Sequence, residues 1–293
     1  MAFRFLSFFL VFVLCFSTVG SASGIFFELD STSPWHVAQR SEYVPKRDAG
    51  SQDGSFAVGR ELIEFKKEYK HKSGMPIDVS FVLDHYYLRD GTSVDLPASL
   101  QRKGMSVGVK VPMPFVESDC LFIGADLGPY FQSAGEHNFS SSAFRVKSKL
   151  YGIYKPSDRF IFVAGASWRT DYEDQALMPF AGIQYIMNDQ WSLHFLSNEP
   201  FIAYQANERT VFKFKLVNYN DEFEVVSGAR KGDIVKMNEL HAGLGLGYDI
   251  SDNVSVELDM GWAFARKYEY LQNGGKVAPD DGIFAGLKIS AQF

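Results

Sequence analysis

Residues 282–293 read GIFAGLKISAQF and alternate between apolar and polar or small side chains up to the last residue of the chain. Because successive side chains of a β-strand point to opposite sides, this period of two predicts a strand with one apolar face. That face holds Ile283, Ala285, Leu287, Ile289, Ala291 and Phe293. The segment from Val254 to Phe264 alternates in the same way. The end of the chain therefore predicts two neighbouring amphipathic strands.

Similar alternation recurs along most of the chain after residue 60. Many of these runs are longer than the usual strand of a soluble domain and suit a tilted crossing of a bilayer. They predict an all-β fold, a transmembrane antiparallel β-barrel of about twelve strands, within a range of ten to fourteen. The expected crossings are residues 76–90, 103–115, 120–131, 142–154, 160–170, 177–187, 191–197, 200–206, 210–217, 237–249, 253–265 and 282–293.

Short polar pairs separate several of these segments, and a Tyr or Phe stands three positions before each pair. Ser, Asn and Asp favour tight turns because their side chains bond to the local backbone. The pairs are Ser118-Asp119, Ser157-Asp158, Asn188-Asp189, Asn207-Glu208 and Ser251-Asp252. Aromatic side chains at a fixed distance from such turns predict a ring at one membrane interface. These candidate interface aromatics are Phe115, Tyr154, Tyr185, Tyr204 and Tyr248.

The opposite ends of the expected hairpins are longer and more polar. The expected loops are Arg89–Arg102, Gln132–Ser141, Thr170–Ala176, Asn218–Lys236 and Arg266–Asp281. Short turns on one side and long loops on the other are typical of outer-membrane barrels, with the short turns in the periplasm. From about residue 60 onward the chain resembles Gram-negative outer-membrane β-barrel proteins of an uncharacterised family, above all in the terminal strand that ends at Phe293. This resemblance implies that outer-membrane lipids and the barrel-assembly machinery are partners, with Phe293 as the assembly signal.

The first residues have the form of an export signal. Arg4 precedes an apolar run from Phe5 to Phe16, and small residues follow up to Ser23. A charged start, an apolar centre and a small-residue cleavage zone predict a signal peptide over residues 1–23 that is removed on export to the outer membrane. The alternative, a membrane anchor, is disfavoured because about 20 apolar residues are needed to span a bilayer. Residues 24–60 are expected to form an irregular periplasmic or luminal arm, and residues 61–293 the barrel.

The amino-acid composition limits the possible functions of the protein. The chain has 29 basic and 35 acidic residues, a balance that argues against nucleic acid as a partner. Aromatic residues are 15% of the chain, with 27 Phe, which agrees with aromatic girdles at the two membrane interfaces. No metal-ligand spacing and no Gly-rich phosphate loop is found, so no cofactor is expected.

The polar phase of each strand is expected to face the interior of the barrel. The candidate lumen charges are Lys110, Arg145, Lys147, Lys149, Lys213, Lys215, Glu257, Asp259 and Lys288. This mixture of signs is compatible with a lumen closed by ion pairs and with a narrow pore for small solutes. In a pore, the basic groups at Arg145–Lys149 and Lys213–Lys215 would favour anions, because rings of Lys and Arg attract them.

Two other functions remain open at this point. A secreted soluble β-sandwich that acts as a binding module would also show many alternating strands. A lipid-modifying outer-membrane enzyme is suggested by the spacing of His194 and Ser197, which resembles the His-x-Ser of barrel lipid A deacylases. The spacing differs by one residue, and residues i and i+3 of a strand point to opposite faces. We therefore expect no enzyme, and favour a structural or porin-like barrel.

Overall fold

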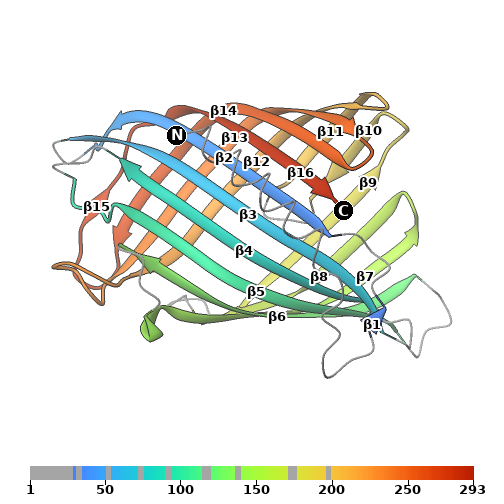
Figure 1. The fold of residues 1–293 in the computed structure, drawn as a ribbon, viewed down its shortest axis with the longest axis horizontal. Helices are drawn as coiled ribbons and strands as arrows, with labels where there is room; N and C mark the ends of the chain where they lie inside the picture. Colours follow the sequence, from blue (N-terminus) through green and yellow to red (C-terminus); the bar gives the residue numbers. More distant parts are fainter. Residues whose placement is uncertain are drawn as a thin grey trace.

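The computed structural model describes residues 29–30, 35–50, 54–71, 76–89, 94–113, 120–135, 140–170, 177–195 and 199–293. Fourteen antiparallel strands close into a single barrel (Figure 1). They are β2 His36–Asp48, β3 Ser55–His71, β4 Pro76–Arg89, β5 Ser99–Pro112, β6 Leu121–Ala134, β7 Phe144–Ser157, β8 Phe160–Arg169, β9 Leu177–Ile186, β10 Trp191–His194, β11 Phe201–Asn207, β12 Thr210–Val225, β13 Ile234–Ser251, β14 Val254–Tyr270 and β16 Gly282–Gln292. The two-residue strands β1 (Leu29–Asp30) and β15 (Lys276–Val277) pair antiparallel with β3 and β14, and a 3₁₀ turn, Ser141–Ala143, precedes β7.

The barrel closes where its first and last long strands meet. β16 pairs with β2 over eight positions, from Ala285 opposite Tyr43 to Gln292 opposite His36. The backbones of Trp35 and Phe293 exchange two hydrogen bonds, of 2.8 and 3.0 Å. Trp35 and Phe293 both lie on the side of the barrel that carries the short turns. The closed single sheet confirms the predicted barrel and excludes the two-sheet sandwich.

All twelve expected crossings are strands, and β2 and β3 bring the number to the top of the expected range. The prediction of an irregular arm over residues 24–60 is wrong for His36–Asp48 and for the first part of β3. β2 escaped detection because polar residues occupy both of its faces: Arg40 and Glu42 point inward, and Gln39 and Ser41 point outward. The expected signal peptide, residues 1–23, lies outside the described residues.

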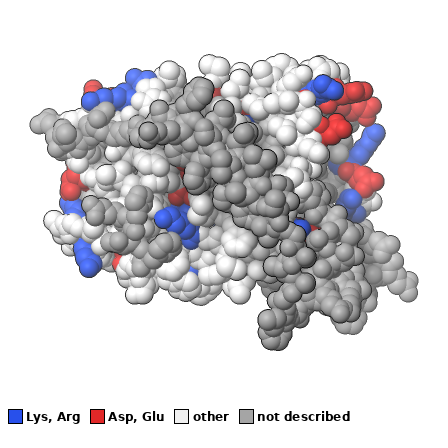
Figure 2. Space-filling view, in the orientation of Figure 1, with Lys and Arg blue, Asp and Glu red and all other residues white. Residues whose placement is uncertain are grey.

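The outward phase of the strands forms an apolar belt. Its exposed members include Leu150, Leu177, Leu244, Leu258, Met260 and Ile283. Figure 2 shows charged side chains gathered mainly toward the two ends of the molecule, with mostly uncharged described surface between them. Backbone groups in hydrocarbon must be bonded within the protein, and a closed barrel does this. No helix among the described residues is long and apolar enough to span a membrane.

Four of the five candidate interface aromatics lie on strands near the short turns. Tyr154, Tyr185 and Tyr248 are exposed, whereas Tyr204 is half-buried and contacts Trp191, with ring centroids 4.9 Å apart. The fifth, Phe115, lies outside the described residues. Their position on the outside near one rim is the arrangement that an interface ring needs, and the ring itself stays a prediction.

The wall has unequal height around the barrel. β10 has four residues and β11 has seven, whereas β12 has sixteen and continues past the end of β11. At its far end β12 pairs in parallel with β6, Glu224 opposite Ser133 and Val225 opposite Ala134. The long strands therefore approach one another at the long-loop end, beyond the short β10–β11 hairpin. The loop expected over Asn218–Lys236 is accordingly shorter, because β12 extends to Val225 and β13 begins at Ile234.

Candidate functional site

The inside of the barrel is filled at the long-loop end by a packed apolar core. The largest buried side chains there are Phe56, Leu100, Phe223 and Tyr268, from β3, β5, β12 and β14. Tyr86 packs edge-to-face against Phe223, and Phe56 against Tyr268, with ring centroids 6.2 and 5.7 Å apart. Such packing excludes water as the core of a soluble domain does. Packed side chains therefore fill the described part of the lumen at the long-loop end, which we call the outer lumen.

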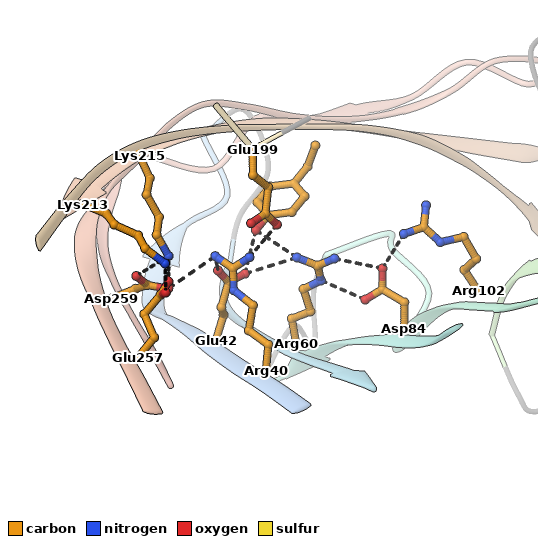
Figure 3. A network of polar contacts seen from close by, with 11 residues as sticks. Arg40, Glu42, Arg60, Asp84, Arg102, Glu199, Lys213, Lys215, Glu257 and Asp259 are labelled. Carbon is orange, nitrogen blue, oxygen red and sulfur yellow. Dashed lines mark hydrogen bonds and ion pairs between the residues drawn. The ribbon is translucent and has the colours of Figure 1, made fainter. Parts of the chain in front are cut away.

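A chain of ion pairs crosses the lumen beneath this core (Figure 3). Arg60 of β3 donates two hydrogen bonds to Asp84 of β4, of 2.8 and 3.0 Å. Arg102 of β5 donates to the same carboxylate at 2.8 Å and to Asp221 of β12 at 3.2 Å. Arg169 of β8 also reaches Asp221, at 3.2 Å. The chain joins strands from opposite walls, so it cross-links the barrel and also blocks its lumen. We call this chain of ion pairs the barrier.

The same chain continues toward β2, β12 and β14. Arg60 donates to the Tyr219 hydroxyl at 2.9 Å, and that hydroxyl donates to Glu42 at 2.8 Å. Arg40 bonds Glu42 at 2.8 Å and lies 3.5 Å from Asp259. Nearly all of these charges are buried, and charges buried in this way are tolerated only when paired.

A cavity of about 720 Å³ lies next to this barrier, and we call it the chamber. Its charged lining is Arg40, Glu64, Lys147, Lys149, Arg169, Glu199 and Lys288. Arg40 is held by Glu199 at 2.5 Å, and Arg169 by Asp221. Lys147, Lys149 and Lys288 form no ion pair with any described residue. The chamber lining therefore carries five basic and two acidic side chains, and its three half-buried lysines make no ion pair within the described part of the chain.

Apolar side chains share the chamber with these lysines. Among them are Met178 and Phe180 of β9, Phe195, and Phe201 of β11, the last two at the ends of the short β10–β11 hairpin loop. The Lys149 ammonium lies 5.8 Å from the centre of the Phe180 ring. Basic groups and aromatic faces therefore line one cavity.

A second cavity of about 710 Å³ opens at the short-turn end, and we call it the vestibule. Ala38 and Glu64 line both cavities, so the two are contiguous. The vestibule has the opposite charge balance. Its acidic lining is Glu64, Glu68, Asp78, Glu208, Asp249 and Asp252, against His36, Lys66 and Arg209.

The structure divides the candidate lumen charges into two groups. Lys213 and Lys215 bond Glu257, and Lys215 also bonds Asp259 at 2.7 Å, so this cluster is neutralised. Lys110 bonds Asp78 at 2.8 Å, and Arg145 lies 3.2 Å from Glu224. Lys147, Lys149 and Lys288 remain for the chamber.

Sequence reasoning missed the barrier residues Arg40, Glu42, Arg60 and Arg102. Arg40 and Glu42 lie in the segment expected to be irregular, and Arg60 at its boundary. Arg102 falls at the end of an expected loop. The one sequence feature that could have indicated this strand is the spacing of Arg40, Glu42 and Val44 at every second position. The residues between them, Ser41 and Tyr43, do not form an apolar face.

The catalytic alternative gains no support from His194. Its Nε2 lies 2.9 Å from Ser192 Oγ, the residue two positions earlier on the same strand face. Ser197, the residue considered as its partner, lies outside the described residues. Among the described residues no group of three or more His, Cys, Asp or Glu side chains is placed to hold a metal ion.

The closed sheet, the apolar belt and the charged interior define an integral β-barrel protein of the outer membrane. The chain belongs to the family described as Domain of unknown function (DUF6268), whose model matches residues 131–278. None of the curated proteins matches the sequence.

Several solved structures are similar in fold at low sequence identity. The COG4313 outer membrane channel from Pseudomonas putida F1 is 11% identical, with 94% of this chain and 100% of that chain covered and a TM-score of 0.48. A Pseudomonas aeruginosa FadL homologue is 10% identical, covering 89% and 91%, with a TM-score of 0.45. The Acinetobacter baumannii outer membrane protein Omp33 is 13% identical, covering 89% and 98%, with a TM-score of 0.43.

Proposed function

We propose that this barrel is a passive channel of the outer membrane that admits small anions. The observation that carries the proposal is the set of three chamber lysines, Lys147, Lys149 and Lys288, without ion-pair partners among the described residues. An uncompensated charge away from bulk water is unfavourable, so such a site attracts a counter-ion. Lys and Arg lining a pore select anions by the same attraction.

Access from the periplasmic side is through the vestibule, whose acidic lining favours cations. The proposed anion preference therefore belongs to the chamber alone. When the chamber lysines are removed, the acidic residues of the vestibule should determine the ion selectivity, which should shift toward cations.

Passage beyond the chamber requires the barrier to open, because the ion-pair chain and the apolar core fill the rest of the described lumen. We propose that conduction occurs in brief openings in which the chain of Arg60, Asp84 and Arg102 separates. A channel of this kind has a low open probability, and weakening the barrier should raise it.

Planar-bilayer recording of the refolded protein under a KCl gradient tests the proposal. We expect infrequent single-channel steps with a reversal potential on the chloride side. The double substitution K147Q/K149Q should move that potential toward potassium, and D84N should raise the open probability. Lys155→Gln serves as the control, because Lys155 lies on the same strand but pairs with Asp158 at the turn. Potassium preference in the wild type, or silence in both wild type and D84N, would refute the channel.

Export and assembly complete the proposal. Residues 1–23 act as the cleaved signal peptide, and the strand that ends at Phe293 is engaged by the barrel-assembly machinery. The hydrogen bonds between Phe293 and Trp35 support a role of the last residue in closing the barrel. Deleting Phe293 should slow barrel closure, measured as the heat-modifiable gel shift during refolding and in cells.

A further inference from the structure

The chamber has two kinds of lining that a simple ion does not use together. Lys147 and Lys149 extend from β7, and Lys288 from β16. Met178, Phe180, Phe195 and Phe201 line the same cavity. A hydrated inorganic anion would satisfy the lysines and leave these apolar side chains against water. Sites for organic ligands combine apolar side chains with placed polar groups, and the chamber has seven apolar and seven charged residues in its lining.

We infer that the chamber binds an organic anion with an aromatic or similarly flat apolar body and a carboxylate group. The carboxylate lies toward Lys147 and Lys149, and the apolar body lies against Phe180 and Phe201. This inference deepens the proposed function, since it names the class of solute that the channel would admit.

The size of the chamber agrees with such a ligand. Its volume of about 720 Å³ lies inside the range of roughly 300–1,000 Å³ that small-molecule sites occupy. The Phe180 ring already has a cation over it, the Lys149 ammonium at 5.8 Å, and Phe201 has Lys213 at 5.2 Å. Each of these rings therefore presents an apolar surface beside a positive charge. His194 stacks on one face of the Phe201 ring, with the ring centroids 4.4 Å apart.

Lys147 and Lys149 are partly buried, which strengthens their attraction for a ligand carboxylate. Charge-assisted hydrogen bonds are stronger than neutral ones, and loss of one is typically worth about tenfold in affinity. Because the two lysines of β7 stand two residues apart on one face, a single carboxylate can accept from both. Removing both should weaken binding by more than about tenfold.

The test is direct binding to the full mature chain, refolded in detergent micelles, with 2-naphthoate as a fluorescent probe. The comparison probes are 2-naphthalenemethanol, which keeps the rings without the charge, and inorganic phosphate, which keeps the charge without the rings. We expect saturable binding of naphthoate, at least about tenfold tighter than either comparison probe. Binding should weaken by more than about tenfold in K147Q/K149Q and stay unchanged in K155Q.

Phe180→Leu separates the two halves of the inference. It should weaken naphthoate binding and leave phosphate binding unchanged. Each variant is checked for the heat-modifiable gel shift of the folded barrel, and Lys288→Gln replaces the double variant if the latter does not fold. Equal binding of naphthoate and the alcohol, equal binding of naphthoate and phosphate, or no effect of the lysine substitutions would overturn the inference.

The binding and conduction experiments fail independently. Naphthoate binding without any conductance would refute the channel and keep the binding site. Anion-selective conductance without naphthoate binding would do the reverse.

Discussion

Leu216 and Val217 are consecutive residues of β12 with side chains on opposite faces of the wall, and both are apolar. Leu216 faces outward and is 39% exposed, whereas Val217 faces inward and is 4% exposed. On the short-turn side of this pair the inward residue is Lys215, and on the long-loop side the outward residue is Asn218. The apolar phase therefore changes from the outside of the barrel to the inside at this point. We interpret it as the level at which the lipid ends.

This boundary predicts different surroundings for two outward positions of β12. In a background with Cys120 replaced by Ser, a spin label at Phe214→Cys should be accessible to oxygen dissolved in lipid. A label at Asn220→Cys should be accessible to a water-soluble nickel complex, because its position lies beyond the boundary. Power-saturation electron paramagnetic resonance in bilayers measures both. Equal lipid accessibility at the two positions would place the boundary elsewhere.

The packed outer lumen predicts that an inward substitution costs more than an outward one on the same strand. Phe223→Ala removes a fully buried ring and should lower the free energy of unfolding by about 3–5 kcal/mol. Phe212→Ala affects an outward side chain and should lower it much less. Urea unfolding followed by tryptophan fluorescence gives both values. Similar losses would mean that no core fills the barrel.

The barrier predicts a contrast between two inward aspartates of β4. Asp84, with a fully buried side chain, accepts hydrogen bonds from Arg60 and Arg102. Asp84→Ala should lower the free energy of unfolding by about 3–5 kcal/mol, because the buried Arg60 and the partly buried Arg102 each lose a carboxylate partner. Asp78 is partly exposed and bonds Lys110 at 2.8 Å, so Asp78→Ala should cost about 1 kcal/mol or less. Unfolding in urea distinguishes them, and equal losses would show that burial of the chain is not what stabilises it.

The loop between β12 and β13 should loosen in acid. Burial of Asp233 disfavours its charged form, but hydrogen bonds from the Gln272 and Ile234 N–H groups and from the Asn273 amide outweigh this and lower the pKa of the carboxyl. A lowered pKa means that the stabilisation is complete above the ordinary aspartate value of about 3.9. It is lost as the pH falls through the lower value of the folded protein.

Hydrogen–deuterium exchange at the Gln272 amide, corrected for intrinsic rates, measures this loss. Protection should be constant above about pH 4 and decline below it. Asp233→Asn should show weaker protection that does not change with pH over the same interval. A wild-type protection that stays constant down to acid unfolding would contradict the role of Asp233.

The sequence alone predicts the strands whose outer face is apolar along their whole length. Val254–Phe264 and residues 282–293 alternate so regularly that each is predicted as a strand with one apolar face. The outer lumen was not foreseen, because an apolar residue that faces inward at Val217 or Phe223 has the same appearance as one that faces lipid. Only the three-dimensional arrangement shows which side of the wall each phase occupies.

The lumen charges show a second limit. Their inward phase follows from the alternation, but the neutralisation of Lys215 by Asp259 does not, since β13 lies between the two strands. Gly245 of β13 makes the contact possible: a Cβ there would lie 2.7 Å from the Asp259 carboxylate and 3.0 Å from Lys215 Cε. The pairing depends on register across three strands, which spacing along one strand cannot supply.

The central claim is that hydrocarbon covers the outer face of this barrel. Trp168, Trp191 and Trp262 report on it without any substitution, because all three side chains are on the outer face and exposed. In bilayers of phospholipid brominated on the acyl chains, tryptophan fluorescence should be strongly quenched relative to unbrominated lipid. Unquenched fluorescence, together with a monodisperse folded protein in buffer free of detergent, would contradict the account.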